Sequence, residues 1–162
     1  MALSNLGIFH TAIGVVAIVA AVAAFIKNGK IDLSQLSGKI YFYFTLITSF
    51  TALGLSRHGR FNPGHVFSVF IVILILVAYY LYSKKKETNR ARFFENFLLS
   101  FSFFLSLIPT INETFTRVPV GHPLANGPKD AIIGQTLLVL FVLFVVGSFV
   151  QFSKQRKMNL SA

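Results

Sequence analysis

Four histidines and one glutamate are the side chains of this chain best suited to metal chemistry. The imidazole rings belong to His10, His58, His65 and His122, and the carboxylate belongs to Glu113. Imidazole and carboxylate groups are good ligands for zinc, and imidazole also binds copper and haem iron. A catalytic zinc ion typically has three protein ligands and an open position, where a bound water ionises near neutral pH. These five residues therefore define a candidate metal site.

The spacing of these residues does not match a zinc motif such as HExxH, so the ligands must come from separate segments of the chain. We expect His10, His65 and Glu113 to supply three ligands, with His58 or His122 as a fourth ligand or general base. The expected ion is zinc or copper, and the expected function is a metal-dependent hydrolase or a metal-handling factor. Each side chain also has an ordinary alternative, such as a hydrogen bond to a neighbouring helix or an ion pair with an arginine.

Two other functions fit the same chain. A haem b electron carrier would use two histidines as axial ligands, and His10 and His65 are the best pair. A non-catalytic accessory subunit would offer its phenylalanine-rich and aliphatic helices to a larger membrane complex or to a second copy of the chain. Visible absorption and metal content distinguish these functions, because only the haem protein has a Soret band.

Five long apolar runs must position these side chains. They cover Asn5–Ile26, Ile40–Leu55, His65–Tyr82, Phe93–Ile111 and Ala131–Phe152. A helix needs about 20 mainly apolar residues to cross a hydrocarbon layer about 30 Å thick. The runs are continuous rather than alternating, which predicts helices and excludes a transmembrane barrel. We therefore predict an all-α integral membrane bundle of five transmembrane helices, forming a single domain over residues 1–162.

Composition and charge agree with a membrane protein. The chain is 54% apolar and 12% charged, and it has no cysteine, which excludes disulfides and thiolate metal sites. The net charge of +10 is unevenly placed, with eleven basic residues on one side of the predicted membrane and four on the other. The eleven are Lys27, Lys30, Lys39, Lys84, Lys85, Lys86, Arg90, Arg92, Lys154, Arg156 and Lys157.

The uneven placement of charge sets the expected topology. Basic residues mark the cytoplasmic side, so we predict an outside N-terminus and a cytoplasmic C-terminus. The basic side should contact anionic lipid headgroups, and no nucleic-acid-binding module is present. In this topology all four histidines and Glu113 face the outer side. Glu95 lies near the inner boundary, where we expect it to pair with a lysine or arginine.

Several short motifs resemble those of an uncharacterised family of small bacterial multi-pass membrane proteins. They are His10-xxx-Gly14, Gly38-Lys39-Ile40-Tyr41, Gly54-Leu55, Gly64-His65 and Arg90-Ala91-Arg92, within Leu6–Arg117. The chain departs from the family by having Arg92 where a histidine-arginine pair is expected. The resemblance implies a bacterial inner membrane and histidines near the outer surface, and it implies no activity.

Overall fold

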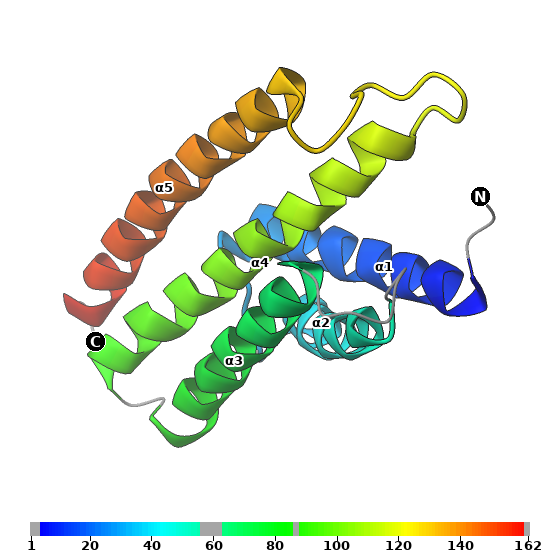
Figure 1. Ribbon diagram of the computed structural model, residues 1–162. Coiled ribbons are helices and arrows are strands. Elements are labelled where there is room, and N and C mark those ends of the chain that lie inside the picture. Colours follow the sequence, from blue (N-terminus) through cyan, green and yellow to red (C-terminus); the bar gives the residue numbers. More distant parts are fainter. Residues whose placement is uncertain (1–3, 56–62, 86–87, 161–162) are drawn as a thin grey trace.

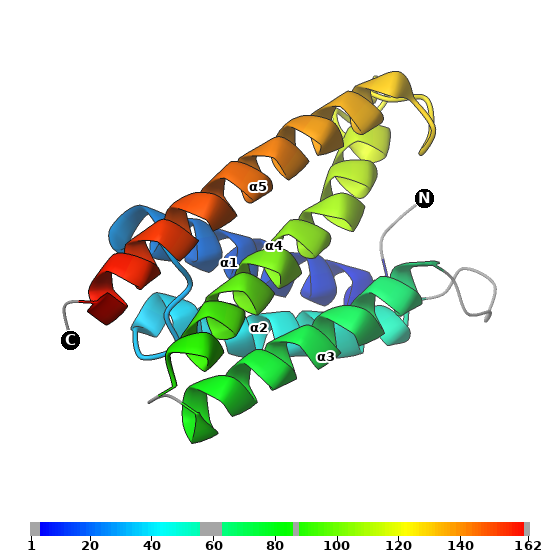
Figure 2. The same ribbon diagram turned by 90° about the vertical axis from the view of Figure 1, so that its left-hand side faces the viewer.

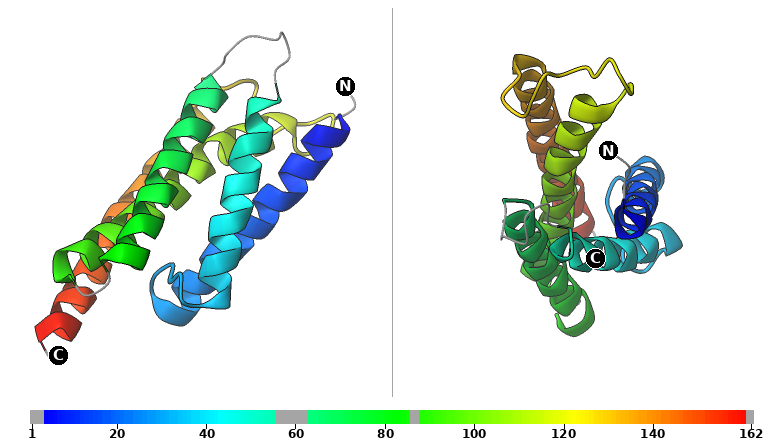
Figure 3. Two further views of the ribbon diagram at one scale, coloured as in Figure 1. Left: turned by 90° about the horizontal axis from the view of Figure 1, so that it is seen from below. Right: turned by 45° about the vertical axis from the view of Figure 1, so that its right-hand side comes forward.

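The computed structural model describes residues 4–55, 63–85 and 88–160, and the regular structure in these ranges is helical. The helices are α1 (Asn5–Asn28), α2 (Leu36–Leu53), α3 (Pro63–Lys84), α4 (Asn89–Arg117) and α5 (Ala131–Leu160). Figure 1 shows the arrangement of the five helices, and the left view of Figure 3 shows that α1, α2 and α3 run in alternating directions. The C-terminal ends of α1, α3 and α5 therefore lie at one end of the bundle, called here the basic end. The N-terminal end of α1 lies at the other, called here the histidine end (Figure 3).

Four of the helices have the length and composition needed to cross a membrane. They are α1, α3, α4 and the described part of α5. Helix α2 is not among them: it is 18 residues long and contains several threonines, serines and tyrosines. The all-helical prediction is confirmed for the described residues, and four of the five predicted spans have suitable helices.

Most helix ends lie beyond the ends of the predicted spans, although α2 ends at Leu53, before the predicted end at Leu55. Helix α2 covers Leu36–Leu53 rather than 40–55, and α4 extends over Asn89–Arg117 rather than 93–111. Polar residues such as Arg90 and Asn112 continue a helix as readily as apolar ones, provided that its backbone hydrogen bonds are made. An apolar run therefore indicates the part of a helix suited to lipid, whereas the helix itself continues beyond it.

Helix α1 packs against α2 through a face of small residues. Ala17, Ala21 and Ala24 are buried at helical spacing. Further toward the histidine end, a Cβ added to Gly14 would lie 3.4 Å from the methyl carbon of Thr48 on α2. Small side chains allow two helices to approach closely in lipid, where packing rather than water exclusion stabilises the contact.

A tight link joins α1 to α2 at the basic end. Gly29 ends α1 in the left-handed region, with φ of 69°. The Asp32 carboxylate accepts hydrogen bonds from the Ser34 backbone N–H at 2.9 Å and from the Ser34 hydroxyl at 2.7 Å. Partial burial would raise the pKa of Asp32, but these hydrogen bonds and the nearby Lys30 ammonium more than offset it, so the pKa lies below its ordinary value.

Helix α4 packs between α3 and α5 (Figure 2). Leu99 of α4 and Ile75 of α3 are fully buried within the core. Aromatic rings fill the contact with α5: the ring centroids of Phe104 and Phe144 are 5.3 Å apart, and those of Phe93 and Phe152 are 4.5 Å apart.

A buried hydrogen bond connects α2 to α4 inside the bundle. The Tyr41 and Ser102 side-chain oxygens are 2.7 Å apart, and both residues are almost completely buried. The Ser102 hydroxyl donates to the Leu99 backbone oxygen at 2.8 Å. Because that hydroxyl has only one proton, Tyr41 is the donor in the bond to Ser102.

Helix α5 is the least covered of the apolar helices. In the most apolar 18-residue stretch of α5, 6% of the residues are buried. In the corresponding stretches of α1, α3 and α4, 22% to 39% of the residues are buried. Its large apolar side chains, such as Leu138, Phe149 and Phe152, are exposed. In a membrane this surface contacts lipid or another protein.

Candidate functional site

His10 lies inside the first turns of α1 and is bound to α2. Its Nδ1 atom lies 3.1 Å from the Thr48 backbone oxygen and 3.1 Å from the Thr51 hydroxyl oxygen. The Thr51 hydroxyl donates its own proton to backbone oxygens of α2. A carbonyl oxygen can only accept a hydrogen bond, so Nδ1 of His10 carries a proton and donates it to α2.

The position of this proton decides what the other ring nitrogen can do. In the neutral imidazole of His10, Nε2 then has a lone pair and no proton. A ring whose N–H donates to a backbone carbonyl is the usual arrangement of a metal-ligating histidine, because the hydrogen bond fixes the ring and increases the basicity of the ligand nitrogen. His10 thus has the proton arrangement of a ligand, and the same hydrogen bond also holds α1 to α2.

His65 is buried in the first turns of α3 and also reaches the C-terminal end of α2. Its Nε2 atom lies 3.4 Å from the Leu55 backbone oxygen, so Nε2 is the protonated nitrogen in this contact. Helices α1 and α3 each pack against α2, so His10 and His65 bind the same end of α2 from different helices. A histidine normally ligates haem through Nε2, which His65 uses for Leu55, so the geometry does not favour the His10–His65 haem pair.

Glu113 lies near the C-terminal end of α4 and forms an ion pair with Arg117, one turn further along. The Glu113 and Arg117 side chains are 54% and 40% exposed, and ion pairs this exposed contribute about 0–1 kcal/mol to stability. The Glu113 charge also acts on the His10 ring. Among the predicted ligands, the structure thus relates Glu113 to His10 electrostatically.

The remaining predicted ligands do not complete a site. His122 is exposed in the segment between α4 and α5, where its backbone N–H donates to the Pro119 oxygen at 3.1 Å. His58 lies outside the described residues. Across residues 4–55, 63–85 and 88–160, no group of three or more histidine, cysteine, aspartate or glutamate side chains is arranged to hold a metal ion. The expected ligand set of His10, His65 and Glu113 is therefore not assembled in the described structure.

A second polar cluster, which the sequence analysis did not identify, lies between α4 and α5 near the basic end. The Gln151 side chain accepts from the Ser100 hydroxyl at 2.9 Å and donates to the Gly29 backbone oxygen at 3.0 Å. One turn away, the Asn96 amide donates to the Gln155 side-chain oxygen at 3.1 Å, and Gln155 is 1% exposed.

The signal for this cluster is present in the sequence. Asn96 and Ser100 are four residues apart in one helix, and Gln151 and Gln155 are four apart in another, so each pair shares a helix face. The buried carboxylate of Glu95 lies at the same level of α4 and has an interaction partner of its own. These contacts fix α5 to α4 and to the α1–α2 link.

Comparison with known proteins adds no relative. No protein-family model, curated protein or solved structure matches the chain. The resemblance to small bacterial multi-pass proteins therefore stays a prediction, and the functional argument depends on the chain's own side chains.

Proposed function

We propose that this chain is an integral membrane protein whose histidine end faces outward and whose basic end faces the cytoplasm. The suitable length and composition of four helices support this placement. Helix α2 is proposed as the fifth span. Its polar side chains Tyr41, Thr45 and Ser49 are buried against other helices, so they do not oppose a membrane location. The concentration of lysine and arginine at the basic end supports the orientation, and a bacterial inner membrane is the proposed location.

The proposed function is binding of a transition-metal ion, zinc or copper, at the histidine end through Nε2 of His10. The main support for this proposal is the 3.1 Å contact between Nδ1 of His10 and the Thr48 backbone oxygen. Because that oxygen can only accept, the contact assigns the ring proton to Nδ1 and the lone pair to Nε2. The negative charge of Glu113 acts on the same ring, so it favours a cation there, and its exposed pairing with Arg117 is weak enough to be exchanged for a metal ion.

Such a site is suited to metal handling. If Glu113 joined His10 as a second ligand, the remaining coordination positions would stay with water or with a ligand that receives the metal, so exchange would be easier than in a closed four-ligand site. Imidazole with carboxylate binds zinc and copper better than calcium or magnesium, because the nitrogen ligand favours transition metals.

The substitution His10→Asn tests this proposal without removing the contact between α1 and α2. The Asn side-chain N–H₂ occupies the region of His Nδ1 and can still donate to the Thr48 oxygen, but Asn has no equivalent of Nε2. We expect detergent-purified wild-type protein to bind zinc or copper by isothermal titration calorimetry and elemental analysis. We expect His10→Asn to bind the metal at least tenfold more weakly than the wild type. Loss of a group that only supports a metal ligand already weakens binding by about tenfold or more, and loss of the ligand itself should cost no less.

Two controls complete the experiment. His122→Asn removes an exposed imidazole and should leave affinity unchanged, whereas Glu113→Gln should weaken binding. Unchanged metal affinity in a folded His10→Asn protein would refute the proposal and leave His10 as a packing residue. A Soret band in the purified protein would instead identify haem.

A second candidate function is an accessory subunit of a membrane complex, and the exposure of α5 favours it. Because only 6% of the residues in its most apolar 18-residue stretch are buried, this helix offers a long surface to another membrane protein. Native electrophoresis of mild-detergent extracts tests this function. A larger complex of fixed size that dissociates when surface residues of α5 are substituted would support it. A monomer in lipid nanodiscs would contradict it.

A further inference from the structure

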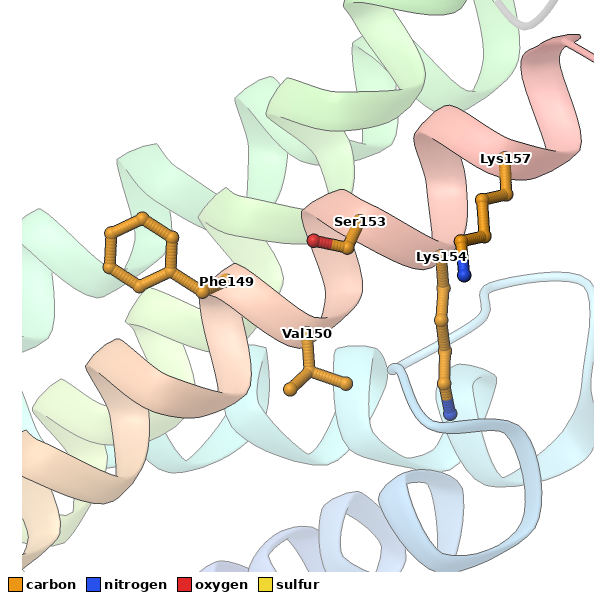
Figure 4. Close-up of a pocket in the computed structure, with 5 residues that line it drawn as sticks. All are labelled: Phe149, Val150, Ser153, Lys154 and Lys157. Atoms are coloured by element: carbon orange, nitrogen blue, oxygen red, sulfur yellow. The ribbon is translucent and has the colours of Figure 1, made fainter.

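A shallow groove lies along α5 at the basic end of the bundle. It has a volume of about 250 Å³ and is lined by Phe149, Val150, Ser153, Lys154 and Lys157. The Lys154 and Lys157 side chains extend from α5 toward the α1–α2 link (Figure 4). The Lys154 Nζ atom lies 3.7 Å from the position that a Cβ on Gly29 would occupy. The groove thus combines two ammonium groups with an apolar surface one turn closer to the middle of the helix.

The charge around the groove is strongly positive. In the described part of the basic end, ten lysines and arginines face two acidic residues, Asp32 and Glu95. Asp32 pairs with Lys30 at 3.5 Å and is hydrogen-bonded by Ser34. Glu95 is buried and has its own partner. None of the described carboxylates forms an ion pair with Lys154, so an anion from outside the protein is the natural partner of that ammonium.

The apolar side of the groove indicates what kind of anion fits. Phe149 is 71% exposed and Val150 is 47% exposed, directly beside the lysines on a helix that the rest of the bundle hardly covers. A free phosphate would contact only the lysines and Ser153. A phospholipid would also place an acyl chain along Phe149 and Val150, at the depth expected for a chain attached to an interfacial phosphate.

We propose that this groove binds the phosphate group of an anionic phospholipid, with Lys154 as its main cationic contact and Phe149 and Val150 against the acyl chain. The proposal rests on the membrane placement given under Proposed function. It goes beyond general attraction of a basic surface to a membrane, because it assigns one site and predicts that one lysine matters more than others at the same end.

The experiment uses the full-length protein in detergent, with native mass spectrometry of bound lipid. The probes are phosphatidylglycerol, phosphatidylcholine and inorganic phosphate. Wild-type protein should retain phosphatidylglycerol in preference to phosphatidylcholine. The substitution Lys154→Ala should reduce that retention roughly fivefold, the contribution of one basic residue near an anionic headgroup. The matched control Lys84→Ala, which removes an exposed lysine of α3 at the same end, should change it less than about twofold.

Phe149→Ala distinguishes a lipid from a free anion. This exposed ring should contribute to retention of phosphatidylglycerol and not to binding of inorganic phosphate. Equal retention of both lipids by the wild type, equal effects of Lys154→Ala and Lys84→Ala, or complete displacement of lipid by inorganic phosphate would each overturn the proposal. Alkaline carbonate extraction, run in parallel, separates the two hypotheses: release of the chain refutes the membrane placement, whereas retention in the membrane without lipid preference refutes only the groove.

Discussion

The hydrogen bond between Tyr41 and Ser102 makes a sharp prediction about how the two halves of the bundle are joined. Tyr41 donates, because the single proton of Ser102 is already donated to the Leu99 oxygen. Tyr41→Phe removes the donor but leaves Ser102 with its bond to Leu99, so the cost should be about 0.6 kcal/mol, the average for hydrogen bonds between membrane helices. Ser102→Ala removes the nearest acceptor of the buried Tyr41 hydroxyl, which then has the Thr45 and Ser106 hydroxyls in its surroundings. This substitution should therefore cost more, about 1–2 kcal/mol.

The double substitution follows from the same reasoning. With both hydroxyls removed, no donor is left without an acceptor, so the double variant should have nearly the stability of Tyr41→Phe. Tyr41→Phe should therefore rescue Ser102→Ala, with a coupling energy equal in size to the cost of Ser102→Ala alone, about 1–2 kcal/mol. Unfolding in mixed detergent–SDS micelles, followed by circular dichroism, measures all three free energies. Tyr43→Phe, on an exposed tyrosine of the same helix, is the control and should cost nothing. Additive costs, with no rescue in the double variant, would refute the bond itself, and a larger cost for Tyr41→Phe than for Ser102→Ala would refute its assigned direction.

Three other predictions concern single residues, each checked by thermal or SDS unfolding in detergent. Gly38→Ala should disrupt the α1–α2 link, because a Cβ there would lie 2.0 Å from the Asp32 backbone oxygen. A Cβ added to Gly134 would have no atom within 4 Å, so Gly134→Ala should stabilise α5 by about 0.5–1 kcal/mol. The carboxylate of Asp32 has a lowered pKa in the folded state. Its contribution, less than about 1 kcal/mol for a carboxylate that is only partly buried, should be present above about pH 4 and be lost as the pH falls through the folded pKa. Gln151→Ala should cost about 1–2 kcal/mol because it breaks two hydrogen bonds, and Gln135→Ala at an exposed position should cost nothing.

The hydropathy of the chain was sufficient to predict where its helices lie, because long continuous apolar runs favour helices over alternating strands. The ends of α2 and α4 were not predictable in the same way. Ser37 and Lys39 belong to the helix although they interrupt the apolar pattern, since backbone hydrogen bonds rather than hydropathy determine where a helix begins.

The candidate site was less predictable because it depends on which helices become neighbours. The sequence places His10, His65 and Glu113 at one end of the bundle but contains no information on their separation across α2. Each histidine instead binds a backbone oxygen of α2 or of the segment that follows it: His10 binds Thr48, and His65 binds Leu55. Such contacts cannot be predicted from the sequence, because every residue has a backbone carbonyl group that could accept the hydrogen bond. The Gln151 contact with Gly29 was missed for the same reason.

The most direct test of the account is the placement of the two ends of the bundle on opposite sides of a membrane. The chain has no cysteine, so single cysteines can be introduced at Ser34 in the α1–α2 link and at Val120 between α4 and α5, both exposed. With a membrane-impermeant maleimide, Val120→Cys should be labelled in intact cells, and Ser34→Cys only after the membrane is opened. Labelling of both cysteines from the same side would contradict the account.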